Sequence, residues 1–96
     1  MQPHELKQHM ESGEDIDLID VREATEFTAG SKIPGSRNIP MGQIFLDAGA
    51  GKFPKDKKIV VLCKSGARCD IVARELTAKG YNIESLEGGV EAWERL

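Results

Sequence analysis

The sequence has few of the residues that build disulfide frameworks. It contains two cysteines, Cys63 and Cys69, among 96 residues. Two cysteines are too few for a disulfide framework, and a chain of this length can bury a core without one. We therefore expect a reducing, cytoplasmic compartment. No apolar run approaches the ~20 residues that span a bilayer, and the polar N-terminal segment lacks the apolar stretch of a signal peptide. No membrane association is expected.

Basic residues are also scarce relative to acidic ones. Lys and Arg number 13 against 16 Asp and Glu, which gives a net charge of -3. Without a basic excess to neutralise phosphates, a general nucleic-acid partner is not expected. The two histidines, His4 and His9, lie far in sequence from both cysteines and outside the usual zinc-ligand spacings, so no metal site is predicted.

What the chain does have is an alternation of short apolar segments with amphipathic ones. Residues 16–20 (IDLID) and 59–63 (IVVLC) are typical of buried strands. Shorter strands are expected around 36–39 and 83–86, and helical segments over 3–13, 22–30, 43–49, 68–80 and 90–96. The pattern predicts a single α/β domain over residues 1–96. Its core is an open parallel sheet of about five short strands with helices on both faces.

Cys63 ends the most strand-like segment of the chain. In an open parallel sheet, ligands bind at the carboxyl ends of the strands, so Cys63 is expected at a chemically useful edge. A turn must follow before the next helix begins near Arg68 or Cys69, and its residues are Lys64, Ser65, Gly66, Ala67 and Arg68. Their small side chains suit a tight loop whose backbone N–H groups point inward and form an anion-binding nest.

The same loop should activate the thiol. The helix N-terminus adds a partial positive charge, and Lys64 and Arg68 add two full ones. Each of these favours the thiolate, so we expect the pKa of Cys63 to be depressed. The alternative is a structural cysteine that ends a buried strand, because free cysteine is often buried.

Asp20 ends a second predicted strand and should lie at the same edge. One interpretation makes it a charge partner for a loop cation or for Arg22. The other makes it the N-cap of a helix over 22–27. Arg22 and Glu23 are expected to form a structural ion pair or to serve as charges at the helix start.

Three motifs give the chain a family resemblance. The segment CKSGAR (63–68) resembles the active-site loop of the rhodanese family. DVREATEFTAGSKIPGSRNIP (20–40) is similar to the first signature of that family, and GGVEAW (88–93) is similar to its usual ending. The three occur in the expected order and cover nearly the whole chain, which therefore looks like a single rhodanese domain.

The resemblance implies sulfurtransferase chemistry. A small anionic donor such as thiosulfate would give up a sulfane sulfur to Cys63, and the loop residues 64–68 would hold the anion. An acceptor such as cyanide, a thiol or a protein would then remove the sulfur from the Cys63 persulfide. The resemblance implies no metal and no organic cofactor. Asp20 and Arg22 would be supporting residues.

Two other functions stay open. Related phosphatases resemble rhodaneses but carry Cys-x5-Arg, whereas this chain has Cys-x4-Arg from Cys63 to Arg68. The longer loop admits a tetrahedral oxyanion, so phosphatase or arsenate reductase activity is the alternative enzyme. A rhodanese fold can also be a non-catalytic interaction module, although that role usually accompanies loss of the loop cysteine.

Cys69 departs from the family pattern, which often has serine or another small residue there. One interpretation is a small side chain packed under the loop. The other is a resolving thiol that attacks a Cys63 persulfide or forms a disulfide with Cys63. A disulfide requires the two Cα atoms to lie within ~7 Å of each other.

Overall fold

The computed structural model describes all residues, 1–96, and contains one parallel sheet with five helices. The elements are α1 (Pro3–Glu11), β1 (Asp17–Asp20), α2 (Ala24–Ala29), β2 (Arg37–Asn38), α3 (Met41–Gly49), β3 (Ile59–Leu62), α4 (Ala67–Ala78), β4 (Ile83–Ser85) and α5 (Gly89–Glu94). The strand order is β2-β1-β3-β4, and every pair is parallel. The predicted α/β class is confirmed, with four strands rather than about five.

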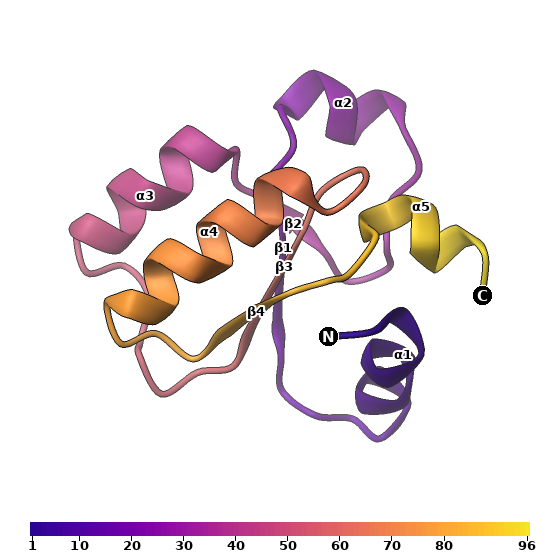
Figure 1. Ribbon diagram of the computed structural model, residues 1–96, viewed down its shortest axis with the longest axis horizontal. Helices are drawn as coiled ribbons and strands as arrows, with labels where there is room; N and C mark the ends of the chain where they lie inside the picture. The colour runs from indigo at the N-terminus through magenta and orange to yellow at the C-terminus, as the bar shows by residue number, and fades with distance from the viewer.

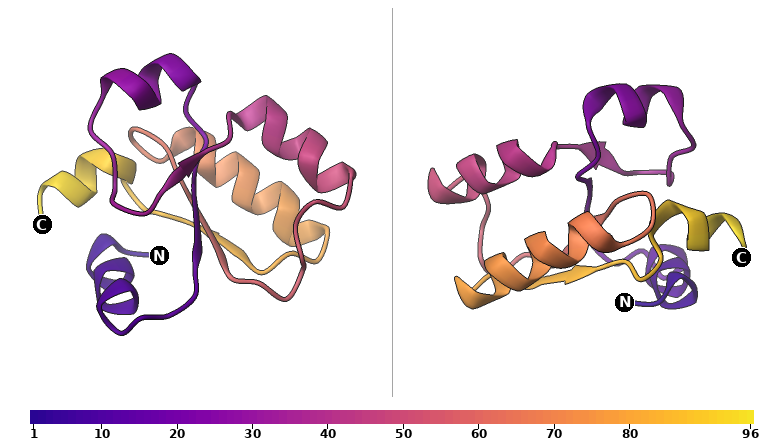
Figure 2. Two further views of the ribbon diagram at one scale, coloured as in Figure 1. Left: turned by 180° about the vertical axis from the view of Figure 1, so that it is seen from behind. Right: turned by 45° about the horizontal axis from the view of Figure 1, so that its top comes forward.

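Helices cover both faces of the sheet, as the sequence predicted. Side chains of a strand alternate between its faces. Ile59 and Val61 therefore join the larger buried cluster beneath α3 and α4. Val60 and Leu62 join the smaller one beneath α1 and α5. Figures 1 and 2 show these two helix pairs on opposite sides of the sheet. Because β3 is buried on both faces, its sequence is continuously apolar.

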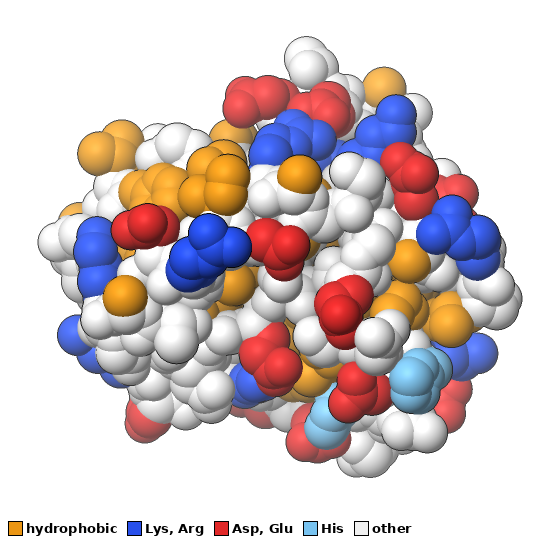
Figure 3. Space-filling view, in the orientation of Figure 1, with side chains coloured by type: hydrophobic (Ala, Val, Ile, Leu, Met, Phe, Trp, Pro, Cys, Tyr) orange, Lys and Arg blue, Asp and Glu red, His pale blue; other side chains and the backbone are white.

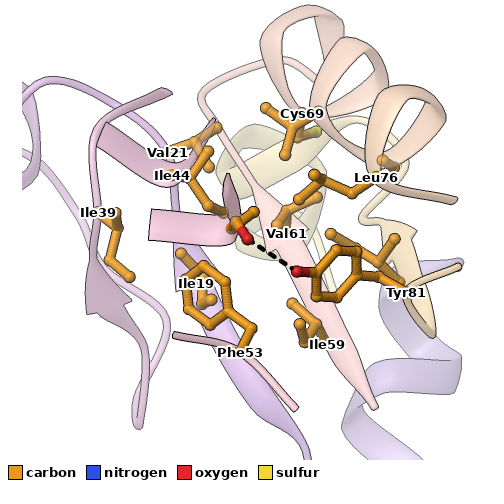
Figure 4. Close-up of a cluster of buried hydrophobic side chains, with 14 of the residues drawn as sticks. Ile19, Val21, Ile39, Ile44, Phe53, Ile59, Val61, Cys69, Leu76 and Tyr81 are labelled. Atoms are coloured by element: carbon orange, nitrogen blue, oxygen red, sulfur yellow. Dashed lines mark hydrogen bonds between the residues drawn. The ribbon is translucent and has the colours of Figure 1, made fainter. Parts of the chain in front are cut away.

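The larger cluster is held together by side chains from the sheet and both of its helices (Figure 4). At its lower end the Tyr81 hydroxyl donates a hydrogen bond of 3.0 Å to the carbonyl of Ala48, which joins the ends of α4 and α3. At its upper end lies Cys69, in the first turn of α4, within the same cluster as Val21 and Val61. This packing fixes the start of α4 above the carboxyl end of β3.

Three segments gather at the carboxyl ends of the central strands. They are α2, the loop between β3 and α4, and the start of α5 (Figure 1). The helix predicted from residue 22 begins later, at Ala24, because the backbone at Arg22 is bonded to Asp20 instead.

Acidic and basic side chains are interspersed over the face of the molecule that Figure 3 shows. None of the five helices has the length and apolarity needed to cross a bilayer.

Candidate active site

Cys63 follows the last residue of β3 and sits at the bottom of a tight loop. Only 1% of the residue is exposed. The amide of Gly66 donates a hydrogen bond of 3.1 Å to Cys63 Sγ. Gly66 has φ 109°, a conformation that L side chains rarely adopt, and it is the residue before α4 begins. The glycine therefore lets the chain turn back over the sulfur within three residues.

The backbone amides of this loop are available to bind an anion. From Lys64 to Cys69 they donate to no backbone carbonyl, because the residues precede or form the first turn of α4. Besides Gly66, the amides of Arg68 and Cys69 face Cys63 closely enough to lower its pKa. The twelve-residue helix α4 begins here, so its partial positive charge adds to theirs. The loop is thus an anion-binding nest built around one sulfur atom.

These contacts make Cys63 acidic. Its pKa is lowered to about 5 from an ordinary value of 9.0. The largest cause is the hydrogen bond from the Cys69 side chain, and the amides of Cys69, Gly66 and Arg68 act in the same direction. Burial opposes them but is outweighed. Cys63 is therefore a thiolate at neutral pH, which is the nucleophilic form.

Cys69 has the opposite character. Its Sγ lies 3.6 Å from Cys63 Sγ, and it faces the carbonyl oxygens of Gly66 at 3.2 Å and Leu86 at 3.8 Å. The Cys63 sulfur raises the pKa of Cys69 most, and burial raises it further. Carbonyl oxygens accept hydrogen bonds but cannot stabilise a thiolate, so Cys69 stays a thiol and donates. Both cysteines are free.

The guanidinium group of Arg68 is bonded to a neighbouring helix. It forms two hydrogen bonds to Glu26 of α2, with Nη1 2.6 Å from Oε1 and Nη2 3.0 Å from Oε2. The bond to Arg68 lowers the pKa of Glu26 to about 2. Glu26 raises the pKa of Arg68 most, with smaller contributions from Cys63 and Asp20. Arg68 is thus held by the carboxylate of Glu26, a residue that the sequence did not single out. The Glu-Phe pair inside the first motif was its only signal.

The other loop side chains make fewer contacts. Lys64, Ser65 and Ala67 are exposed, and Gly66 is buried. The predicted loop residues are therefore brought together around Cys63 mainly by their backbone. The charges of Lys64 and Arg68 lie at its outer edge.

Asp20 and Arg22 form a buried ion pair at the same end of the sheet. Arg22 Nη2 lies 2.7 Å from Asp20 Oδ2, and its Nε lies 3.0 Å from both carboxylate oxygens. Asp20 is completely buried, and 4% of Arg22 is exposed. The alternative that Asp20 caps the next helix is wrong, since Glu23 occupies that position. The expected ion pair between Arg22 and Glu23 is replaced by this one.

Arg22 also fixes the surrounding loops. Its Nη2 donates to the carbonyl of Ser31 at 2.8 Å. The side-chain amide of Asn38 donates to the carbonyls of Asp20 at 3.0 Å and Arg22 at 2.8 Å. The segment from β1 to β2 is thereby closed around one buried cation. Asn38 is a further supporting residue that the sequence reasoning did not identify.

The start of α5 supports the loop from the other side. The amides of Val90 and Glu91 donate to the carbonyls of Cys63 at 2.9 Å and Lys64 at 3.1 Å. A Cβ atom on Gly89 would lie 2.3 Å from the Cys63 carbonyl oxygen, and its φ is +60°. Only glycine fits there. The Gly-Gly pair of the third motif therefore serves the loop, a role that its place in the sequence did not reveal.

The chain is similar to known proteins over nearly its whole length. The model of the rhodanese-like domain family matches residues 2–96. "Putative sulfurtransferase YtwF" of Bacillus subtilis is 39% identical over 89 residues, which are 93% of this chain and 84% of that protein. A "Sulfurtransferase" of Allochromatium vinosum is 35% identical over 91 residues, 94% of this chain and 82% of that protein. A rhodanese-like domain protein of Staphylococcus aureus has a similar crystal structure, with TM-score 0.83 at 31% identity, covering 97% of this chain and 88% of that one.

Proposed function

Because the chain belongs to the rhodanese-like domain family, we propose that it is a sulfurtransferase that carries a sulfane sulfur as a persulfide on Cys63. The similar proteins named as sulfurtransferases support sulfur transfer in general. The observation that carries the finer assignment is the setting of Cys63 Sγ, which accepts the Gly66 amide at 3.1 Å inside a loop of unpaired amides. Such a sulfur is both nucleophilic and ready to hold an anionic adduct.

The proposed reaction has two steps. The Cys63 thiolate attacks the outer sulfur of thiosulfate, the sulfur–sulfur bond of the donor breaks, and sulfite leaves with the electron pair. The outer sulfur of the new persulfide then carries the negative charge, which the loop amides stabilise. In the second step cyanide or a thiolate attacks that outer sulfur. The product is thiocyanate or a new persulfide, and Cys63 leaves as a thiolate. This is covalent catalysis by an activated nucleophile.

The site favours small or flexible partners. Because Cys63 is 1% exposed, an acceptor must meet the outer sulfur rather than the cysteine itself. The exposed side chains of Lys64 and Ser65 leave the mouth of the loop open to a thiol group presented by another protein. We therefore propose an anionic sulfur donor, with a low-molecular-weight nucleophile or a protein thiol as acceptor.

Phosphate transfer is less well supported by the same loop. A phosphoryl group needs a free guanidinium group to hold two of its oxygens. Here both terminal nitrogens of Arg68 are bonded to Glu26. The loop is also one residue shorter than the Cys-x5-Arg loop of related phosphatases. We include a phosphate ester only as a negative control.

The proposal is tested by incubating the protein with thiosulfate and measuring its intact mass. We expect a gain of one sulfur atom, its removal by cyanide with formation of thiocyanate, and no gain in a Cys63→Ser variant. A phosphate ester should not be hydrolysed. Sulfur loading that persists in Cys63→Ser, or no loading of either the wild type or a Cys69→Ser variant, contradicts the proposal.

A further inference from the structure

The second sulfur beside Cys63 donates a hydrogen bond to the thiolate but forms no covalent bond in the transfer reaction just described. Cys69 is completely buried, and its Sγ lies 3.6 Å from Cys63 Sγ. We propose that Cys69 resolves the Cys63 persulfide, so that the protein also releases the sulfane sulfur as hydrosulfide and closes a Cys63–Cys69 disulfide. This inference rests on the proposed function, because it needs the persulfide.

The step is balanced without any further reactant. Cys69 Sγ attacks Cys63 Sγ, the inner sulfur of the persulfide. A bond forms between the two cysteine sulfurs, and the bond from Cys63 Sγ to the outer sulfur breaks. The outer sulfur leaves with that electron pair and with the proton that Cys69 gives up, as hydrosulfide. The two cysteines are oxidised together by two electrons, and the sulfane sulfur is reduced by two.

The distance between the sulfurs is short enough for this reaction. A disulfide bond is about 2.05 Å long, so the two atoms must approach by about 1.5 Å from 3.6 Å. Rotation of two cysteine side chains supplies part of such a movement, and Cys69 lies in the first turn of α4, three residues after Gly66. A thiol held this close has a large advantage over one that must diffuse in.

Because Cys63 is buried, the inner and outer sulfurs of its persulfide are open to different nucleophiles. A thiol from solution can reach the outer sulfur at the mouth of the loop, but Cys63 Sγ lies beneath it. Cys69 approaches from the core, where it packs in the buried cluster shared with Val61 and Leu76. External acceptors therefore take the outer sulfur, whereas Cys69 attacks the inner one. The two outcomes compete for the same intermediate.

The electrostatics of Cys63 and Cys69 change when the sulfane sulfur is loaded, and only then does attack by Cys69 become favourable. In the resting protein the Cys63 sulfur is the main reason that the pKa of Cys69 is raised. Once Cys63 Sγ is bonded to a second sulfur, the negative charge moves to that outer atom and this cause weakens. The loop amides, which face an anion in both states, then stabilise the departing hydrosulfide. Cys69 thus changes from hydrogen-bond donor to nucleophile.

We expect the balance between the two outcomes to depend on the acceptor. With abundant acceptor, the outer sulfur is transferred and Cys63 returns as a thiolate. Without acceptor, one equivalent of hydrosulfide appears and the disulfide remains. A small thiol or a protein dithiol then reduces the disulfide by exchange and resets the pair.

The test is a single turnover without acceptor. Wild-type protein, Cys69→Ser and Cys69→Ala are loaded with thiosulfate, freed of excess donor by gel filtration and sampled over time. Each sample is alkylated and its intact mass is measured, while sulfide is trapped by a bimane reagent. We expect the wild type to lose the added sulfur, to lose two further hydrogens as the disulfide forms, and to release one equivalent of sulfide. Both variants should keep their persulfide on the order of tenfold longer or more.

The outcomes separate this inference from the proposed function. If neither the wild type nor the variants gain sulfur, the proposed function fails. If all of them gain sulfur and lose it at the same rate, with no Cys63–Cys69 disulfide in a non-reducing peptide map, the inference is wrong and the sulfurtransferase stands. Serine keeps the size and the donor capacity of Cys69, so a difference between wild type and Cys69→Ser reports the thiol itself.

Discussion

The sulfur atoms of Cys63 and Cys69 lie 3.6 Å apart and face backbone groups of opposite polarity. The amide of Gly66 donates to Cys63, whereas the carbonyl of Gly66 lies 3.2 Å from Cys69. One residue thus stabilises a thiolate on one side and a thiol on the other. Together with the hydrogen bond from Cys69, this arrangement favours Cys63 as the proposed nucleophile.

The first prediction concerns the pH dependence of alkylation. Because the pKa of Cys63 is lowered to about 5, its thiolate fraction rises as the pH increases through about 5 and is complete at neutral pH. The rate of Cys63 alkylation by iodoacetamide should follow this curve. Peptide mapping should show Cys69 unmodified in the folded protein. A midpoint near the ordinary pKa of 9.0 would contradict the assignment.

Substitutions of Cys69 test its role as the hydrogen-bond donor to Cys63. Cys69→Ala removes the largest cause of the lowered pKa, so the midpoint of the alkylation curve should move to higher pH. Cys69→Ser retains a donor and should move it less. Cys63 remains in the loop in both variants, so the shift measures the hydrogen bond. An unchanged midpoint in Cys69→Ala would assign the acidity of Cys63 to the backbone amides alone.

The contact between Arg68 and Glu26 leads to a prediction on donor affinity. Arg68→Ala removes a cation beside the loop, so KM for thiosulfate should rise more than kcat falls. Glu26→Gln frees the guanidinium group from its carboxylate partner and should lower KM for the same anion. Steady-state kinetics of thiocyanate formation measures both. If Glu26→Gln raises KM as Arg68→Ala does, the pair acts as a unit that positions the loop.

Gly89 offers a test of how α5 supports the loop. In Gly89→Ala, the new methyl group would lie 2.3 Å from the Cys63 carbonyl oxygen, in a backbone with φ +60°. The strain and the clash should cost roughly 2 kcal/mol or more of unfolding free energy. Cys63 should become less reactive, because the loop must shift. Urea unfolding and the alkylation rate measure these two effects.

Gly42 is the matched control for that substitution. It lies near the start of α3, and nothing within 4 Å would meet a Cβ atom there. Gly42→Ala should stabilise the protein by about 0.5 kcal/mol, because alanine favours a helix more than glycine does. Its alkylation rate should equal that of the wild type. Equal stability of the two alanine variants would exclude the contact between Gly89 and Cys63 as the cause.

Because Asp20 and Arg22 form a buried ion pair, removing Arg22 alone should destabilise the protein more than removing both charges. Arg22→Leu leaves the Asp20 carboxylate buried without its guanidinium partner and should cost about 3–5 kcal/mol. In the double variant Asp20→Asn/Arg22→Leu no charge is buried, and Asn can still accept from the amide of residue 22. Urea unfolding should therefore find the double variant more stable than Arg22→Leu. The reverse order would mean that the unpartnered Asp20 carboxylate is not the main cost of removing Arg22.

The sequence predicted the architecture well because its patterns are local. The apolar run at 59–62 reflects a strand that is buried on both faces of the sheet. The glycines mark where helices end. One boundary shifted where a side chain bonded to backbone two residues away. The helix expected from residue 22 starts at Ala24 because Arg22 turns back to Asp20. The sequence offered Asp20 as a partner of Arg22 but left open whether it capped the helix instead.

By itself, the sequence determined the parallel α/β class, the place of Cys63 at a strand end and the small residues of the loop after it. Those features follow from hydrophobic periodicity and from the turn chemistry of neighbouring residues. Only the tertiary structure decided which groups surround the sulfur. It brought Glu26 to Arg68 across 42 positions, Gly89 to Cys63, and Cys69 to within 3.6 Å of Cys63. Hydrogen bonds and steric contacts depend on distance in space, and the fold alone sets that distance.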